Sequence, residues 1–135
     1  MARILVVEDE EDILNLIRIR LRKAGHQVAA LSRPEDALQV VNQSPPDLVV
    51  LDVGLPGMNG LELLEELRGR PGLDDVPAIF LSAHVREEDV EAGRSMEAVY
   101  LTKPFVATAL LNAVEKILDG REDDASSTDS SDPYG

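Results

Sequence analysis

The sequence contains no cysteine and no tryptophan, and its aromatic residues are limited to two Phe and two Tyr. Without cysteine there is no disulfide framework and no thiolate ligand for zinc or an iron–sulfur cluster. No apolar run approaches the ~20 residues of a membrane-spanning helix, and the first residues do not have the pattern of a signal peptide. We therefore expect a cytoplasmic protein that does not associate with membranes.

Basic residues are also scarce. The chain has 13 Lys and Arg against 26 Asp and Glu, which gives a net charge of −13 at pH 7. Binding to nucleic-acid phosphates requires clustered cations, so direct nucleic-acid binding is excluded, whereas divalent cations and basic partner surfaces remain compatible. A length of 135 residues with 44% hydrophobic residues is typical of one domain with a substantial core.

Strand-like and helix-like patterns alternate along residues 1–119. Short apolar runs bounded by turn residues are typical of strands buried on both faces, and apolar residues every three to four positions indicate helices. The expected strands are 3–7, 26–31, 48–52, 77–82 and 98–101, and the expected helices are 11–24, 34–43, 60–68, 86–96 and 106–118. Val106 is expected to face inward on the last helix. Residues 120–135 are rich in Asp and Ser, which predicts a disordered tail or the start of a linker.

Five alternations of strand and helix with short connections predict an α/β domain of the doubly wound type. Its parallel sheet would carry helices on both faces, joined by right-handed crossovers. In such sheets ligands bind at the carboxyl ends of the strands, at the switch point in strand order. Glu8 and Asp9 follow the first strand and Asp52 ends the third, so we expect these carboxylates to meet. Taken alone, Asp52 is equally compatible with a loop or helix cap.

The expected cluster has the composition of a phosphoryl-transfer site. Neighbouring carboxylates raise one another's pKa unless a cation lies between them, and oxygen ligands of this kind suit Mg²⁺. The last two strands end near Ser82 and Lys103, a hydroxyl and a positive charge that suit anionic oxygens. Phosphoryl transfer depends mainly on positioning and charge neutralisation, and an Asp carboxylate is a known nucleophile for it.

Four segments together carry a family resemblance: residues 4–9, 48–60, 80–83 and 100–105. In this order and spacing they resemble the receiver domain of bacterial two-component response regulators, the chemotaxis regulators included, over residues 3–119. The resemblance implies a flavodoxin-like (βα)5 fold with strand order 2-1-3-4-5. It also implies a signalling phosphoprotein rather than a turnover enzyme, with self-phosphorylation from small phosphodonors and self-dephosphorylation.

The resemblance further implies roles for individual residues. Asp52 matches the phosphoacceptor, which receives a phosphoryl group from a sensor histidine kinase or a histidine phosphotransfer protein, and the domain then switches conformation to control a partner or output. Asp9 matches a direct Mg²⁺ ligand, Asp52 a further ligand, Glu8 a ligand acting through water, and Gly54 a ligand through its backbone carbonyl; Mn²⁺ is expected to substitute.

Ser82 and Lys103 match the residues that bind phosphoryl oxygens, and Ser82 and Tyr100 match the switch residues. The Lys103–Pro104 peptide is usually cis in the family. Taken alone, a tyrosine such as Tyr100 is more often a rim aromatic, and His84 is expected to be a loop residue at the edge of the site that modulates dephosphorylation. Gly54 leaves the space over the acceptor open, and we hypothesise that this shortens the phosphorylated lifetime.

Two departures from the family pattern concern the last strand and the helix before it. Met96 stands where a Gly is usual, and Ala98 and Val99 replace a common acidic pair. The dimerisation mode of the transcriptional subfamily is therefore in doubt, and we expect a monomer or a weak phosphorylation-dependent dimer. Leu16 and Ile19 lie off the core stripe of their helix and suit a kinase-docking surface.

Three other functions are weighed against this reading. A phosphatase of the haloacid-dehalogenase type needs a second Asp two residues after the first, where this chain has Gly54. A flavin-binding module of similar topology needs aromatic residues, which are few here. A receiver-like module that binds partners without phosphorylation would not need to retain the complete set of site residues, which is Glu8, Asp9, Asp52, Ser82 and Lys103. The kinase, the signal and the downstream partner are not predictable from the sequence, nor is a place in a phosphorelay or in a longer protein.

Overall fold

The computed structural model describes residues 2–83, 98–120 and 134. Within these residues the strands are β1 (Arg3–Val7), β2 (Gln27–Leu31), β3 (Leu48–Asp52), β4 (Ala78–Ser82) and β5 (Ala98–Thr102), and the helices are α1 (Glu11–Lys23), α2 (Pro34–Gln43), α3 (Gly60–Arg68) and α5 (Ala107–Asp119). All strand pairs are parallel, and their order is β2-β1-β3-β4-β5. This confirms the predicted fold. The helix expected at 86–96, together with His84 and Met96, lies outside the described residues.

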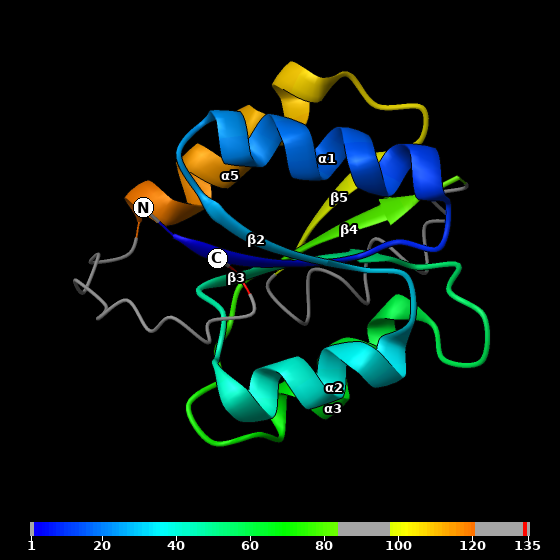
Figure 1. The fold of residues 1–135 in the computed structure, drawn as a ribbon, viewed down its shortest axis with the longest axis vertical. Coiled ribbons are helices and arrows are strands. Elements are labelled where there is room, and N and C mark those ends of the chain that lie inside the picture. Colours follow the sequence, from blue (N-terminus) through cyan, green and yellow to red (C-terminus); the bar gives the residue numbers. More distant parts are fainter. Residues whose placement is uncertain (1, 84–97, 121–133, 135) are drawn as a thin grey trace.

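The sheet is the middle layer of three. Helices α1 and α5 cover one face, and α2 and α3 cover the other (Figure 1). Side chains of a strand point alternately to opposite faces, so each buried strand supplies both layers: Leu5 and Val7 belong to the cluster under α2 and α3, while Ile4 and Val6 belong to the cluster under α1 and α5. This alternation explains why the apolar runs of the sequence are continuous.

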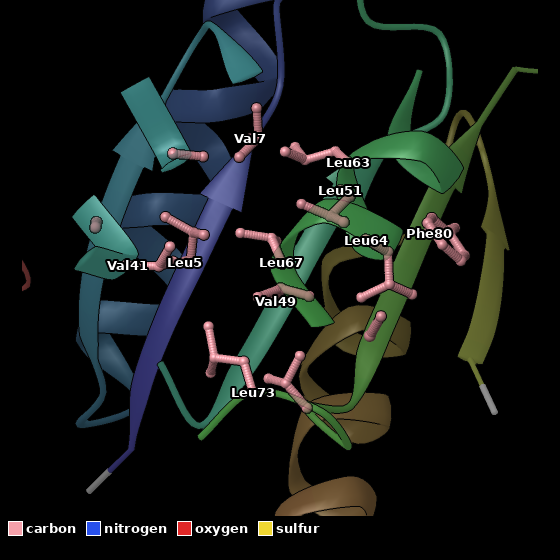
Figure 2. Close-up of a cluster of buried hydrophobic side chains, with 14 of the residues drawn as sticks. Leu5, Val7, Val41, Val49, Leu51, Leu63, Leu64, Leu67, Leu73 and Phe80 are labelled. Carbon is pink, nitrogen blue, oxygen red and sulfur yellow. The ribbon is translucent and has the colours of Figure 1, made fainter. Parts of the chain in front are cut away.

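The cluster beneath α2 and α3 is formed by strands β1, β3 and β4 and by one stripe of each helix. Figure 2 labels Leu5, Val7, Val41, Val49, Leu51, Leu63, Leu64, Leu67, Leu73 and Phe80 within it. Most of these side chains are fully excluded from water, and burying a side chain of this size contributes about 1.5–3 kcal/mol. This packing holds β1 and β3 in place, and with them the carboxyl ends of the two strands.

Two details of the helices differ from the sequence-based expectation. Val106 is 67% exposed, because α5 begins at Ala107 and Val106 is its N-cap rather than part of its inner face. On α3, the sequence pattern predicts an inner face of Leu61, Leu64 and Leu67, but Leu63 is fully buried beside Leu64 and Leu67. No helix among the described residues is long and apolar enough to cross a membrane.

The segment after α5 also differs from expectation at one residue. Gly120 is the C-cap of α5, and Tyr134 is only 1% exposed and belongs to the cluster under α2 and α3. The prediction of a disordered tail or linker start over 120–135 did not anticipate this buried residue. Residues 121–133 and 135 lie outside the described residues.

Candidate functional site

Three carboxylates meet at the carboxyl ends of β1 and β3. Glu8 and Asp9 directly follow β1, and Asp52 is the last residue of the neighbouring β3. One ligand oxygen from each lies within 4.8 Å of the others. Glu8 is fully buried and Asp52 is 5% exposed, whereas Asp9 is exposed. The topology thus produces the juxtaposition that was expected from the strand order.

Asp52 is held by the backbone that follows it. The Gly54 N–H donates to Asp52 Oδ1 at 3.0 Å, and the Val53 N–H donates to the Leu81 carbonyl of β4 at 2.9 Å. The start of α3 packs directly against the same peptide: a Cβ at Gly60 would lie 2.6 Å from the Asp52 carbonyl oxygen. Only glycine permits this approach, so Gly60 fixes the spacing between the strand end and the helix.

The N-terminus of α3 is closed by its own side chains. Asn59 Oδ1 accepts from the Glu62 N–H at 2.9 Å, and the Glu62 carboxylate accepts from the Asn59 N–H at 3.4 Å, which forms a capping box. This reciprocal cap begins the helix at Gly60 and fixes where the loop from Asp52 ends.

Lys103 brings a positive charge to the acidic cluster. Its ammonium forms an ion pair with Glu8 and lies 3.4 Å from Asp52 Oδ2. A third carboxylate, Glu10, lies 3.3 Å from the same nitrogen. The Lys103 N–H donates to the Ser82 carbonyl at 2.7 Å, and the peptide that joins Lys103 to Pro104 is cis, as the family resemblance implied.

The ionisation of the cluster is strongly perturbed. Burial raises the pKa of Glu8 to about 7, although the ion pair with Lys103 opposes the rise. Burial and a hydrogen bond with Asp9 raise the pKa of Asp52, and the same hydrogen bond lowers the pKa of Asp9. Burial disfavours the charged form of Lys103, but Glu8 and Asp52 outweigh it and raise its pKa. The site therefore holds more negative charge than one lysine neutralises.

The donor set fits a hard divalent cation. All three residues offer carboxylate oxygens, the ligand type that Mg²⁺ prefers, and their ligand atoms are close enough to share one ion. Glu8 keeps a fixed orientation because its second oxygen accepts the Glu10 N–H at 3.0 Å. An ion beside Asp52 and Asp9 would favour the ionised form of both carboxylates.

The other predicted site residues lie on the two neighbouring strands. Ser82 ends β4 and is 6% exposed, and its register partner on β5 is Thr102. Tyr100 of β5 is half-buried, and its ring centroid lies 5.1 Å from that of Phe80. A Cβ at Gly54 would lie 3.8 Å from Asp52 Oδ1, an ordinary contact, so the structure has room for a side chain beside the acceptor.

Two residues of the site were missed by the sequence reasoning. Glu10 belongs to an acidic run, which gives no indication of which carboxylate turns toward Lys103. Gly60 was part of a recognised motif, but its contact with the Asp52 backbone depends on the angle between β3 and α3. The sequence does show a glycine directly after a helix-capping Asn, but this pattern alone does not identify the contact.

Comparison with known proteins identifies relatives over most of the chain. A family model described as "Response regulator receiver domain" matches residues 4–115. An uncharacterised 14.6 kDa protein of Leptolyngbya boryana is 39% identical over 84% of this chain and 87% of its own length. The transcriptional regulatory protein KdpE of Mycobacterium tuberculosis is 42% identical over 78% of this chain and 46% of its own length. The chain thus spans about half the length of that regulator.

Solved structures agree with this relationship. Chemotaxis protein CheY4 of Vibrio cholerae superposes with a TM-score of 0.81 at 26% identity, over 87% of this chain and 98% of its own. A response regulator from Chloroflexus aurantiacus gives a TM-score of 0.78 at 32% identity, with the same coverage of 87% and 98%. Both superpositions cover most of this chain and nearly all of the matched chain.

Proposed function

The chain belongs to the response regulator receiver domain family, and on that premise we propose that Asp52 is its phosphoacceptor. The observation that carries this proposal is the position of Asp52: a nearly buried carboxylate at the end of β3, 3.4 Å from the Lys103 ammonium and grouped with Glu8 and Asp9. A carboxylate in such surroundings is available as a nucleophile toward a dianionic phosphoryl group.

The phosphoryl donor is a phosphohistidine on a sensor histidine kinase or a histidine phosphotransfer protein. A carboxylate oxygen of Asp52 attacks the phosphorus, a P–O bond forms, and the P–N bond breaks. The bonding electron pair returns to the imidazole nitrogen, and the product is an aspartyl-phosphate. In dephosphorylation, water attacks the phosphorus, the P–O bond to Asp52 breaks, and the carboxylate and inorganic phosphate are released. Because the phosphorylated product is the domain itself, carrying the phosphoryl group on Asp52, the domain acts as a phosphoacceptor rather than as a turnover enzyme.

Charge neutralisation is the main catalytic requirement of this transfer. Mg²⁺, or Mn²⁺ in its place, would be held by Asp9, by Glu8 through water and by the Gly54 carbonyl, and when bound it supplies positive charge to the phosphoryl oxygens. Lys103 adds a second positive charge on the side of Asp52 Oδ2. The Gly54 N–H keeps Oδ1 oriented throughout.

The signal leaves the site through β4 and β5. Ser82 ends β4, and Tyr100 on β5 is the register partner of Phe80 on β4. Movement of the Ser82 hydroxyl toward a phosphoryl oxygen would therefore act on the β4–β5 pair, which carries the Tyr100 ring. Rotation of Tyr100 would then change the surface at the carboxyl side of β5. The output is control of a partner protein, either by this domain alone, within a phosphorelay or within a longer protein.

The partner that delivers the phosphoryl group is expected to dock on α1. Leu16 and Ile19 are 41% and 58% exposed on this helix, which begins directly after the acidic cluster. Apolar residues exposed beside a reaction site suit a protein partner. We place the domain in the cytoplasm, where histidine kinases present their phosphohistidine, as a monomer or a weak phosphorylation-dependent dimer.

The test is incubation with acetyl phosphate, with and without Mg²⁺, followed by intact-mass measurement. The native protein is expected to gain one phosphoryl group only with Mg²⁺, and the Asp52→Asn variant to gain none. Asp74→Asn is the matched control, because Asp74 is an exposed carboxylate in the α3–β4 loop. Phosphorylation that persists in Asp52→Asn, or is lost equally in Asp74→Asn, would overturn the assignment. Turnover of a phosphomonoester would instead favour a phosphatase.

A further inference from the structure

A tyrosine far beyond the last helix is packed into the core of the domain. Tyr134 follows Gly120, the end of α5, by 14 positions, yet it is the largest of the fully buried side chains. It belongs to the cluster on the α2 and α3 face, which also includes the small side chains of Ala29 on β2 and Ala37 on α2.

The hydroxyl and the backbone carbonyl of Tyr134 each have a specific hydrogen-bond partner. Its hydroxyl donates to the Ser44 carbonyl at 2.8 Å in a buried hydrogen bond. Ser44 is the C-cap of α2, and its own hydroxyl accepts from Arg3 Nη1 at 2.8 Å. The Tyr134 carbonyl accepts the Val28 N–H at 3.1 Å. A buried phenol requires such a partner, so the ring is fixed at both ends.

The backbone contact lies on the open edge of the sheet. Strand β2 is an outer strand, and successive N–H groups of a strand point to opposite sides. The Gln27 N–H donates toward β1, to the Ala2 carbonyl at 2.9 Å, so the Val28 N–H points away from the sheet. Tyr134 thus accepts from a donor that an additional strand would use, and it makes the main-chain contact of β-strand addition.

We propose that Val28, Ser44, Ala29 and Ala37 form a docking site for an aromatic residue on an extended segment, and that its occupant is Tyr134 of the same chain. Fourteen residues reach at most about 48 Å when extended, which exceeds the width of a domain of this size, so the connection to α5 permits docking in cis. A tethered occupant is also favoured by its high effective concentration. The docked residue covers the β2 edge at Val28.

The dock is independent of the phosphoacceptor. Val28 pairs with Ile4 near the amino ends of the strands, whereas Asp52 lies at the carboxyl end of β3. The proposal therefore stands or fails separately from the proposed function, and phosphorylation of Asp52 in each variant below reports on that function alone.

Amide hydrogen exchange at Val28 tests the dock in the full chain. Tyr134→Phe keeps the ring and the backbone but removes the hydroxyl, whereas Tyr134→Ala removes the anchor. We expect slow exchange of the Val28 amide in the native protein and in Tyr134→Phe, and exchange at least about tenfold faster in Tyr134→Ala. The melting temperature should fall by about 10 °C in Tyr134→Ala and less in Tyr134→Phe. Equal Val28 exchange in all three proteins would overturn the proposal.

Tyrosine fluorescence gives a second measurement that does not depend on a destabilised variant. The chain has two tyrosines and no tryptophan, so Tyr100→Phe leaves Tyr134 as the single emitter. Docking predicts acrylamide quenching several-fold weaker than for a free tyrosine amide, with no change over about a hundredfold dilution. Quenching as efficient as that of the free amide would show an undocked residue, and protection lost on dilution would show docking onto a second copy; either result overturns docking in cis.

Discussion

Lys103 and Glu8 form an ion pair at the base of the acidic site, with side chains that are 10% and 0% exposed. Asp52 lies beside this pair rather than in its place, 3.4 Å from the same ammonium. The lysine is therefore shared between Asp52, the proposed phosphoacceptor, and Glu8. A fully buried Glu8 also lacks the water that normally stabilises its charge, and its ionisation becomes coupled to folding.

The first prediction concerns this coupling in the metal-free protein. The folded-state pKa of Glu8 is raised from its usual 4.5 to about 7, so the folded state binds a proton that the unfolded state has already released. This contribution to stability is fully present below pH 4.5 and is lost as the pH rises to about 7. Over this pH range, we expect the free energy of unfolding of the native protein to fall by at most about 3 kcal/mol relative to that of Glu8→Gln. The measurement is urea unfolding in EDTA.

Magnesium provides the control for that titration. A divalent cation at the cluster favours the ionised carboxylates, so addition of Mg²⁺ should stabilise the native protein most at pH 7 and above, and should stabilise Glu8→Gln less. If the stability of native protein relative to Glu8→Gln rises with pH instead of falling, Glu8 is not held in a desolvated environment.

The second prediction concerns Glu10, which adds an exposed negative charge 3.3 Å from the Lys103 ammonium. The free energy of unfolding of Glu10→Gln should stay within about 1 kcal/mol of the native value, because exposed ion pairs contribute little to stability. It should speed phosphorylation by acetyl phosphate about two- to fivefold, since removal of one nearby charge lowers the repulsion of an anionic donor.

Glu11→Gln is the matched control for this effect. It removes the same charge one residue further along, in the first turn of α1, where no contact with Lys103 is observed among the described residues. An equal acceleration in both variants, compared at the same Mg²⁺ concentration, would attribute the effect to net charge and would dismiss a local role for Glu10.

The third prediction concerns Gly60, whose absent Cβ permits α3 to touch the strand end. A methyl group here would meet the Asp52 carbonyl oxygen at 2.6 Å and the Val53 Cα at 3.2 Å, so backbone must move. Gly60→Ala should lower the free energy of unfolding by about 1–3 kcal/mol and slow phosphorylation of Asp52 at saturating Mg²⁺. Gly69→Ala serves as the control, because its nearest contact is 3.4 Å and its backbone is helical. Similar losses in both variants would contradict a specific contact at Gly60.

The sheet and its acidic end were predictable from the sequence for a simple physical reason. Parallel strands buried on both faces produce uninterrupted apolar runs, and a charged residue directly after such a run must lie at the strand end. Leu48–Asp52 and Arg3–Val7 have this form, and the strand order then brings Asp52 to Glu8 and Asp9. Here local pattern and global topology agree.

The remaining features depend on contacts between residues distant in sequence. Tyr134 lies in an acidic, Ser-rich segment whose composition predicts disorder, and one buried ring in the core does not alter that composition. Glu10 is the second carboxylate of this acidic run, after Glu8, that contacts Lys103. That contact joins residues 93 positions apart. Val106 was misplaced because helix boundaries shift by a residue without changing periodicity. Pattern analysis has no access to such pairings.

The last prediction concerns how long the aspartyl-phosphate survives. Gly54 follows the acceptor by two residues, and a Cβ there would lie 3.8 Å from Asp52 Oδ1, so a longer side chain fits without strain and extends over the acceptor. Gly54→Arg should therefore obstruct the approach of water and slow dephosphorylation several-fold, with Gly54→Ala close to native because its methyl group makes only an ordinary contact. The measurement is loss of the phosphorylated species by intact mass after removal of acetyl phosphate. Dephosphorylation that is slower in the native protein than in Gly54→Arg would contradict the view that the open space above Asp52 shortens the signal.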